Sequence, residues 1–266
     1  MPSNQPALWG SGDAYERYMG RWSRKVAPLF TDWLGAGEGL TWMDVGCGTG
    51  VLTSTILDRC DPAAVVGIDS APAMIETVRQ RCTDPRASFA EGSAQHLPAE
   101  GGMFDVAVSG LVLNFVADKA RKLSEMKRVC RPGGTVGLYV WDYAGHMQIM
   151  RTFFDAARAL DGSAAAFDDG VKAPECRPGP LAGLFEDAGL AAVEVTALDI
   201  TAAFDDFDDY WKPFLGGTGS APKYCASLDE VARMRLREAV RRLIRTGPDG
   251  EILLAARAWG VKGRVP

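Results

Sequence analysis

The nine residues from Trp42 to Gly50, WMDVGCGTG, decide the fold of this 266-residue chain. Residues 40–45 are mostly apolar and predict a short buried strand, and residues 51–57 predict a helix. Between them lie three glycines, which permit positive φ angles and allow the backbone to approach a ligand closely. The N-terminus of the following helix offers unpaired N–H groups. The stretch therefore predicts a ligand-binding turn at the end of a buried strand.

The same alternation of strand and helix continues along the chain. Short apolar runs at 65–68, 87–90, 104–108 and 135–141 predict further strands, and 131–134 (RPGG) predicts a turn. Segments 73–81 and 119–130 predict the intervening helices. Such an alternation is typical of a parallel sheet covered on both faces. Right-handed crossovers then place the carboxyl ends of all these strands at one edge of the sheet.

The flanking segments are less regular. We expect Asp13 to cap an N-terminal helix that carries Tyr15, Tyr18 and Trp22, and Pro28 to start a new turn. After residue 141, the pattern predicts helices at 146–160, 181–188, 206–214 and 228–244, a loop at 161–180, and strands at 193–200 and 252–261.

These elements predict an α/β fold with a Rossmann-like, seven-stranded, mostly parallel sheet, helices on both faces and helical lid insertions. We expect a single domain, in which residues 1–39 form a helical cap and residues 40–141 form the cofactor-binding core. Residues 142–266 then supply the lid insertions and the last two strands.

Composition excludes several classes of function. The formal net charge of −5 argues against a generic nucleic-acid binder. There is no apolar run of about 18–20 residues, and residues 1–10 do not resemble a secretory signal. The six cysteines form no C-x-x-C pair, and the two histidines are fifty residues apart. We therefore expect no metal, no disulfide framework, no membrane association and a cytoplasmic location.

The spacing of the glycines does not match the fingerprint G-x-G-x-x-G of dinucleotide-binding folds, because Val51 stands where the last glycine would fall. Asp44 comes just before the glycines and would add negative charge beside a pyrophosphate. A carboxylate at this position instead suits a ligand with a cationic centre.

A second acid ends the next strand along the chain, where residues 65–68 lead into Asp69. A carboxylate at the tip of this strand can accept hydrogen bonds from both hydroxyls of a ribose. The alternative is that Asp69 caps the helix that follows Ser70, Ala71 and Pro72.

These motifs together resemble those of the class I S-adenosylmethionine-dependent methyltransferases, especially the small-molecule group similar to the ubiquinone and menaquinone biosynthesis methyltransferases. The resemblance is good over residues 15–141 and loose elsewhere. It rests on the glycine turn and, in the same order as in the family, on residues 66–74, 91–98, 104–115 and 125–134.

The resemblance implies S-adenosylmethionine as the cofactor. By analogy, the three glycines shape the turn around the methionine part, Asp44 faces its ammonium group, and Asp69 binds the ribose. The carbonyl of Ser109 would accept from the ammonium, and the N-terminal helix would close over the cofactor, unless that helix simply packs on the sheet. The cofactor-binding residues implied are Tyr15, Tyr18, Arg21, Asp44, Gly46, Cys47, Gly48, Gly50, Asp69, Ser70, Met74, Ser93, Ala94 and Ser109.

One position departs from the family pattern. The family often has an aspartate where Ser93 stands, and a hydroxyl accepts a hydrogen bond more weakly than a carboxylate does. Ala94 would contribute only its backbone N–H. We therefore expect adenine recognition to rely on packing by Met74 and Leu97.

The acceptor side offers few candidates for a general base. His146 follows the strand at 135–141, where Asp142 could orient it, and the simpler alternative is a surface histidine that starts a helix. His96, Asp142 and Tyr143 are alternatives. The substrate-binding residues expected are Asn114, Trp141 and Tyr143.

Two further segments carry unusual composition. Residues 204–211 mix four acids with four aromatics, which suits a cationic substrate or, more simply, a capped helix whose aromatic residues are buried. Residues 231–245 carry six arginines, but Leu236, Val240, Leu243 and Ile244 form an apolar face, which favours an amphipathic helix over a nucleic-acid site.

The leading hypothesis is a methyltransferase that acts on a small molecule by in-line displacement at the sulfonium. The alternatives are a methyltransferase that acts on RNA or protein, and a catalytically silent protein that binds the same cofactor for regulation. A nicotinamide oxidoreductase competes only at the level of the fold. Neither the methyl acceptor nor the oligomeric state follows from the sequence.

Overall fold

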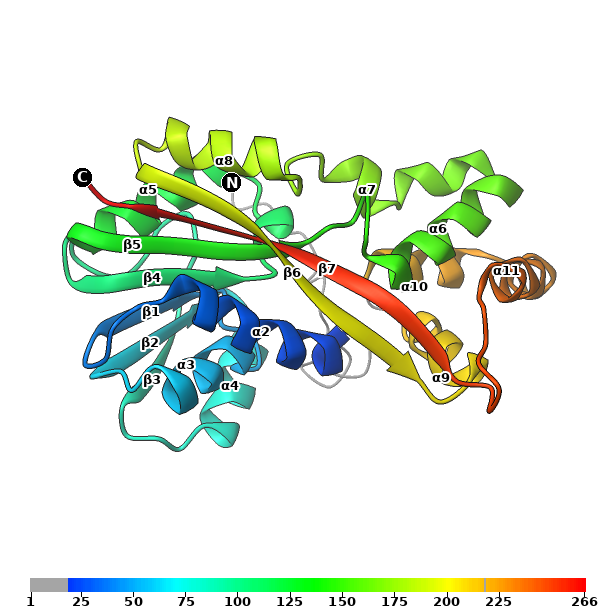
Figure 1. Cartoon of the computed structure of the whole chain (residues 1–266), viewed down its shortest axis with the longest axis horizontal. Helices are drawn as coiled ribbons and strands as arrows, with labels where there is room; N and C mark the ends of the chain where they lie inside the picture. The colour runs from blue at the N-terminus through cyan, green and yellow to red at the C-terminus, as the bar shows by residue number, and fades with distance from the viewer. Residues whose placement is uncertain (1–18, 218) are drawn as a thin grey trace. The chain divides into compact units, whose positions relative to one another are not determined.

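The computed structural model describes residues 19–217 and 219–266. In this part of the chain, seven strands form one sheet in the order β3-β2-β1-β4-β5-β7-β6 (Figure 1). Strands β1 to β5 pair in parallel, and β7 runs antiparallel to β5. The predicted fold class is confirmed. The strands are β1 (Thr41–Val45), β2 (Ala64–Asp69), β3 (Ala87–Glu91), β4 (Phe104–Gly110), β5 (Cys130–Trp141), β6 (Ala191–Phe204) and β7 (Ile252–Arg264).

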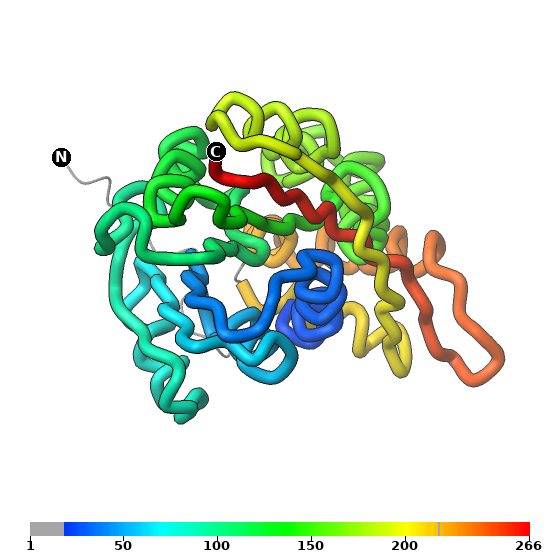
Figure 2. The backbone as a smooth tube through the Cα atoms, turned by 60° about the vertical axis from the view of Figure 1, so that its left-hand side comes forward, coloured from blue at the N-terminus to red at the C-terminus, as the bar shows by residue number. Residues whose placement is uncertain are grey.

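Helices connect these strands. Among them, α5 and α8 lie on one face of the sheet, and α2, α3 and α4 lie on the other (Figures 1 and 2). The α-helices are α2 (Arg21–Leu34), α3 (Val51–Arg59), α4 (Pro72–Arg81), α5 (Lys119–Val129), α6 (Gln148–Leu160), α7 (Asp169–Lys172), α8 (Pro178–Asp187), α9 (Phe207–Trp211), α10 (Ser220–Ser227) and α11 (Glu230–Leu243). Short 3-10 helices are η2 (Leu113–Phe115), η3 (Gly162–Ala166) and η4 (Lys212–Leu215).

The described residues group into two compact units, which we call the core unit and the insertion unit. The core unit comprises residues 23–141, 175–198 and 258–266, and the insertion unit comprises residues 19–22, 142–174 and 199–257. Strands β6 and β7 run through both units. The single-domain organisation with a cap at 1–39, a core at 40–141 and lid insertions at 142–266 stays a prediction.

The core unit is built around strands whose side chains are covered on both faces. Trp42, Met43 and Val45 of β1 are fully buried, as expected for a central parallel strand that reads as a continuous apolar run. On one face, the ring of Phe30 from α2 lies 4.8 Å from that of Tyr139 on β5. On the other face, the Nζ atom of Lys127 on α5 donates to the carbonyl oxygen of Ala188 at the end of α8.

Two predictions about the core unit need correction. Pro28 does not start a new turn, because it lies inside the continuous helix α2, where its carbonyl accepts from Thr31 Oγ1. Strand β5 begins at Cys130 rather than after the predicted turn at 131–134. The register between β4 and β5 shifts at this point, and Gly133 adopts a φ of 78°, so the RPGG segment forms an irregularity within the strand.

The insertion unit is held together by aromatic packing. The ring of Phe153 on α6 stacks on that of Phe214 at a centroid distance of 4.6 Å and contacts Trp211 and Tyr224 at longer distances. The hydroxyl group of Tyr210 donates to the carbonyl of Ile149 at 2.8 Å, which satisfies its buried polar atom.

The segment at 161–180, predicted as a loop, instead contains η3, α7 and the start of α8. Asp161 and Asp168 cap the two short helices by accepting from Ser163 N and Gly170 N. Asp168 is also buried, and its Oδ2 atom forms an ion pair with Arg151 Nη2 at 2.7 Å. These aspartate caps therefore stabilise short helices in a stretch whose alanine-rich and glycine-rich composition is typical of a loop. Helix α10, which the sequence did not predict, follows in the same unit.

Within the described ranges, none of the helices has the length and apolar character needed to cross a bilayer.

Candidate cofactor site

The glycine turn follows β1 in the core unit, and each of its three glycines has a left-handed φ, of 84° at Gly46, 53° at Gly48 and 89° at Gly50. A Cβ atom at Gly46 would lie 2.6 Å from a methyl group of Val112, and one at Gly50 would lie 2.5 Å from a methyl group of Val78. Among the described residues, a Cβ atom at Gly48 would meet nothing within 4 Å. Two glycines thus allow close packing, and the middle one faces open space.

The start of this turn is fixed by the neighbouring strand. The N–H groups of Gly46 and Cys47 both donate to the carbonyl of Ile68 on β2, at 2.7 and 3.0 Å. The turn then closes through a bond from Gly50 N to the carbonyl of Cys47. Gly50 is the N-cap residue of α3 and, as a glycine, has no side chain with which to cap the helix.

Asp69, at the end of β2, accepts a backbone hydrogen bond with each of its carboxylate oxygens, and its ribose-binding role stays a prediction. One carboxylate oxygen accepts from Gly48 N at 2.9 Å, and the other accepts from Ala71 N, at the start of α4, also at 2.9 Å. Each oxygen keeps a second lone pair, so the carboxylate can still accept from a ligand hydroxyl. Its structural role is to tie the glycine turn to the start of α4.

Asp44 is fully buried on β1, directly before the turn. Its Oδ2 atom accepts from the hydroxyl of Thr53 on α3 at 2.7 Å, whereas Oδ1 has no hydrogen-bond partner among the described residues. Burial raises the pKa of Asp44 to about 7, against the lowering effect of Thr53. A buried carboxylate with an unsatisfied oxygen fits a ligand that brings a cationic donor.

The sequence reasoning missed a buried lysine beside these acids. Lys122 of α5 is fully buried, and its Nζ atom donates to the hydroxyl of Ser109 on β4 at 2.7 Å. Ser109 in turn donates to the carbonyl of Val45 at 2.5 Å. Burial lowers the pKa of Lys122 to about 7, while the charges of Asp44 and Asp69 act to raise it. Helical periodicity places Lys122 beside the buried Leu123 and Met126, which was the available signal.

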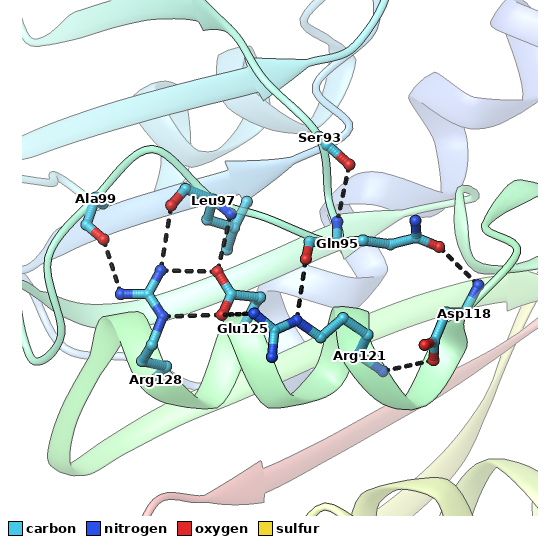
Figure 3. Close-up of polar contacts among 8 residues, drawn as sticks. All are labelled: Ser93, Gln95, Leu97, Ala99, Asp118, Arg121, Glu125 and Arg128. Atoms are coloured by element: carbon cyan, nitrogen blue, oxygen red, sulfur yellow. Dashed lines mark hydrogen bonds and ion pairs between the residues drawn. The ribbon is translucent and has the colours of Figure 1, made fainter. Parts of the chain in front are cut away.

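The loop at 91–98, expected to flank the adenine, is anchored on α5 (Figure 3). Glu125 accepts from Leu97 N at 2.9 Å and forms an ion pair with Arg128, at 2.7 Å. Arg128 donates to the carbonyls of Leu97 and Ala99. The Arg128 guanidinium lowers the pKa of Glu125 to about 2. The spacing of three residues between acid and base on one helix was a signal for this pair.

Within the loop, the Ser93 hydroxyl accepts from Gln95 N at 3.2 Å, which turns the chain locally. Met74 and Leu97, expected to pack on the adenine, are both buried. The cofactor-binding roles of Ser70, Met74, Ser93 and Ala94 stay predictions.

On the N-terminal side, Arg21 is bound by another residue of the insertion unit. Its guanidinium lies 3.0 Å from the carboxylate of Asp209 and stacks on the rings of Trp22 and Phe204. Its cofactor-binding role therefore stays a prediction, and this ion pair competes with it. Tyr15 and Tyr18 lie outside the described residues.

The residues predicted for the acceptor belong to both units. In the insertion unit, Asp142 Oδ2 accepts from His146 N at 2.8 Å and lies 3.7 Å from His146 Nδ1. The His146 side chain is 60% exposed and Tyr143 is buried. In the core unit, Trp141 is buried at the end of β5, and Asn114 lies in η2. Their catalytic and substrate-binding roles stay predictions.

Two segments have the simpler structures considered from the sequence. In the acidic and aromatic stretch, Asp206 caps α9 by accepting from Asp209 N, and Phe207, Tyr210 and Trp211 are buried. The arginine-rich helix α11 is amphipathic.

The apolar face of α11 differs in one respect from the prediction. Leu236 and Val240 are buried, but Leu243 is 56% exposed because the helix ends there. The guanidinium of Arg237 is paired with Asp208, and those of Arg237 and Arg241 lie over the ring of Phe207.

Known proteins resemble this chain in sequence and in fold. The family described as "Methyltransferase domain" matches residues 43–138. The chain is 31% identical over 159 residues to trans-aconitate 2-methyltransferase of Deinococcus radiodurans, a match that covers 59% of each protein. It is 32% identical over 126 residues to 2-phytyl-1,4-naphtoquinone methyltransferase of Trichormus variabilis, which covers 46% of this chain and 55% of the relative. The chain thus spans about half the length of these curated relatives.

A similar solved structure is that of phosphoethanolamine N-methyltransferase 2 of Haemonchus contortus, in complex with phosphomonomethylethanolamine and S-adenosylhomocysteine. It superposes with a TM-score of 0.59 at 15% identity and covers 96% of this chain and 57% of that one. This likeness concerns the fold. Together, these matches confirm the predicted resemblance to the class I S-adenosylmethionine-dependent methyltransferases.

Proposed function

We propose that this chain, whose residues 43–138 match the methyltransferase domain, transfers a methyl group from S-adenosylmethionine to a small-molecule acceptor. The observation that carries the proposal is the pair of acids at adjacent strand ends. Asp44 is buried with an unsatisfied oxygen, and Asp69 holds the glycine turn next to it. The names of the two curated relatives support a small-molecule acceptor.

The residues of the core unit fit this cofactor in chemistry. Asp44 would accept from a cationic amine, Asp69 would accept from ribose hydroxyls through its remaining lone pairs, and Gly48 leaves room beside the turn. The N-terminus of α3, whose N-cap residue is a glycine, offers further N–H donors to an anionic group. When bound, S-adenosylmethionine supplies a methyl group already activated by its sulfonium.

The protein's own contribution is then to orient the acceptor and to accept the proton that the acceptor loses. Orientation in line with the breaking bond is worth about 7–11 kcal/mol in favourable cases. His146 is the candidate base, because Asp142 holds its backbone and lies within 3.7 Å of its Nδ1 atom. A base at this position would accept the proton of a hydroxyl or weakly acidic carbon and add about 10²–10⁴-fold to the rate.

Calorimetric titration with S-adenosylhomocysteine and, separately, with NAD tests the cofactor assignment. We expect S-adenosylhomocysteine to bind, and the variant Asp69→Ala to bind it about 100-fold more weakly, because the charge-assisted bonds to the turn and to the start of α4, and those expected to the ribose, are lost. Binding of NAD without S-adenosylhomocysteine would overturn the proposal. The matched control is Asp84→Ala, which removes an acid of the core unit that pairs with Arg86.

The acceptor class is tested by methyl transfer to a panel of small carboxylic acids, phenols and amines, compared with RNA and bulk protein. Turnover of a small molecule alone supports the proposal. Turnover of RNA or protein alone would replace it, and binding without any turnover would indicate a silent regulatory protein. Once an acceptor is known, an unchanged rate for His146→Ala at saturation would exclude His146 as the base.

We also propose a cytoplasmic location, supported by six cysteines that are all free of disulfides. Cell fractionation with an antibody to the native protein tests it, and recovery from a membrane or secreted fraction would contradict it.

A further inference from the structure

Lys122 occupies a position where a lysine is not needed for packing. Its side chain is fully buried at the point where β1 and β4 separate. The pairing of β1 with β4 ends at Asp44 and Val108, whereas the pairing of β1 with β2 continues to Val45 and Ile68. Beyond the last β1–β4 pair, the bond from Ser109 to the carbonyl of Val45 connects the two strands, and Lys122 donates to that hydroxyl.

A buried ammonium is costly unless opposite charges lie nearby. The charges that act on Lys122 are those of Asp44 and Asp69, the two acids of the proposed cofactor site. The pKa of Asp44 is affected by groups from several elements: Thr53 on α3, Asp69 on β2 and Lys122 on α5. Burial and the charge of Asp44 raise the pKa of the Cys47 thiol in the glycine turn. Of these groups, Lys122 supplies the positive charge.

We propose that Lys122 is a positioning residue of the cofactor site, whose buried ammonium, anchored on the Ser109 hydroxyl, keeps the carboxyl of Asp44 ionised so that it can receive a cationic group of the cofactor. The inference rests on the proposed function, since it requires a cofactor that carries an amine. It explains why the unsatisfied oxygen of Asp44 and the buried lysine occur together.

The consequence is a defined dependence of cofactor affinity on pH. Burial and the charge of Asp69 raise the pKa of Asp44, whereas Lys122 lowers it. Because the ionised form of Asp44 binds the cation, affinity rises as the pH rises through the pKa of Asp44 in the free protein. Burial lowers the pKa of Lys122 to about 7, so its help to Asp44 is present below that pH and is lost as its ammonium deprotonates. Without Lys122, the pKa of Asp44 rises, so the rise in affinity moves to higher pH.

Calorimetric titration of the full chain with S-adenosylhomocysteine from pH 5.5 to 8.5 tests the inference. The variants are Lys122→Met and Lys122→Gln, of which the second keeps a donor for Ser109 without the charge. For both we expect the midpoint of the affinity profile to move upward by up to about one pH unit, which corresponds to up to about tenfold weaker binding at pH 7. Asp44→Asn removes the titrating group, so its profile should lack this rise.

The matched control is Lys127→Met on the same helix. Lys127 is partly exposed and donates to the carbonyls of Ala188 and Gly189, so its removal should leave the midpoint unchanged. An equal loss of affinity at every pH, or an unchanged midpoint in a folded Lys122→Gln protein, would overturn the inference, since a purely structural lysine acts in that way. If the unmodified chain binds no S-adenosylhomocysteine at any pH, the proposed function fails instead. Thermal unfolding of each variant verifies that it is folded.

Discussion

The glycine turn of the core unit is partly exposed at Gly46 and Gly48, whereas the aromatic cluster of the insertion unit is buried, and the two regions depend on different properties of their residues. At the turn, backbone conformation and charge matter most. The three glycines have left-handed φ angles, Asp44 is buried, and the N–H groups of Gly46 and Cys47 donate to the carbonyl of Ile68. In the cluster formed by Phe153, Trp211, Phe214 and Tyr224, the residues are chosen for volume and ring contact.

This difference determines how each region tolerates change. A side chain of similar volume can replace another in an apolar cluster at modest cost, because the contacts are not directional. A left-handed glycine with a methyl group 2.6 Å from its missing Cβ cannot be replaced in this way. Volume should therefore govern the stability of the insertion unit, and backbone conformation and charge should govern ligand binding in the core unit.

The largest expected effect concerns the aromatic cluster. Phe153→Ala should lower the free energy of unfolding by about 3–5 kcal/mol, because it leaves a cavity beside Phe214, whereas Phe153→Leu should cost less than about 1.5 kcal/mol. Urea unfolding followed by tryptophan fluorescence and far-UV circular dichroism measures both. The comparison is weakened if Phe153→Leu costs as much as Phe153→Ala, since shape rather than volume would then dominate.

The next effect concerns the turn itself. Gly46→Ala places a side chain at a φ of 84° and against Val112, so we expect a loss of about 2–3 kcal/mol and a severe loss of S-adenosylhomocysteine binding. Gly133→Ala is the matched control, because Gly133 has a φ of 78° but no neighbour within 4 Å, and it should cost only about 1–2 kcal/mol.

Adding Val112→Ala to the Gly46→Ala protein should restore part of its stability, because the methyl groups in the way are removed. Equal losses for Gly46→Ala and Gly133→Ala would show that backbone strain alone, without the close approach of Val112, explains the glycine at position 46.

The smallest expected effect concerns the anchor of the 91–98 loop on α5. Glu125→Gln removes the charge that pairs with Arg128 and weakens the bond to Leu97, which should cost about 1–3 kcal/mol at pH 7. Because the folded pKa of Glu125 is lowered to about 2, its contribution is present above its ordinary pKa near 4.5 and is lost as the pH falls from about 4.5 to about 2.

Urea unfolding at a series of pH values measures this contribution. The slope of stability against pH in the acid range should be smaller for Glu125→Gln than for the unmodified protein. Glu76→Gln on α4, which changes an exposed glutamate of the same unit, should leave the slope unaltered. Identical slopes for Glu125→Gln and the unmodified protein would show that the ion pair between Glu125 and Arg128 does not contribute to stability.

Much of the core unit could be predicted from the sequence, because its signals are local. Apolar runs located β1, β2, β3 and β4, and the glycine turn with its two acids indicated the site. The insertion unit was harder, since Asp161 and Asp168 cap short helices in a stretch whose composition is typical of a loop. Helix α10 was missed because its order depends on contacts such as that of Tyr224 with Phe153.

The sequence by itself determined the turn, the order of the strands along the chain and the acids at the strand ends, because glycine conformation and apolar periodicity act within a few residues. The tertiary structure alone decided that Lys122 lies with Asp44 and Asp69, and that Glu125 and Arg128 hold the loop at 91–98. Lys122 is far along the chain from Asp44 and Asp69, and Glu125 is 28 residues from Leu97, so local patterns do not connect them. The charge of a buried side chain depends on which partners the fold places beside it.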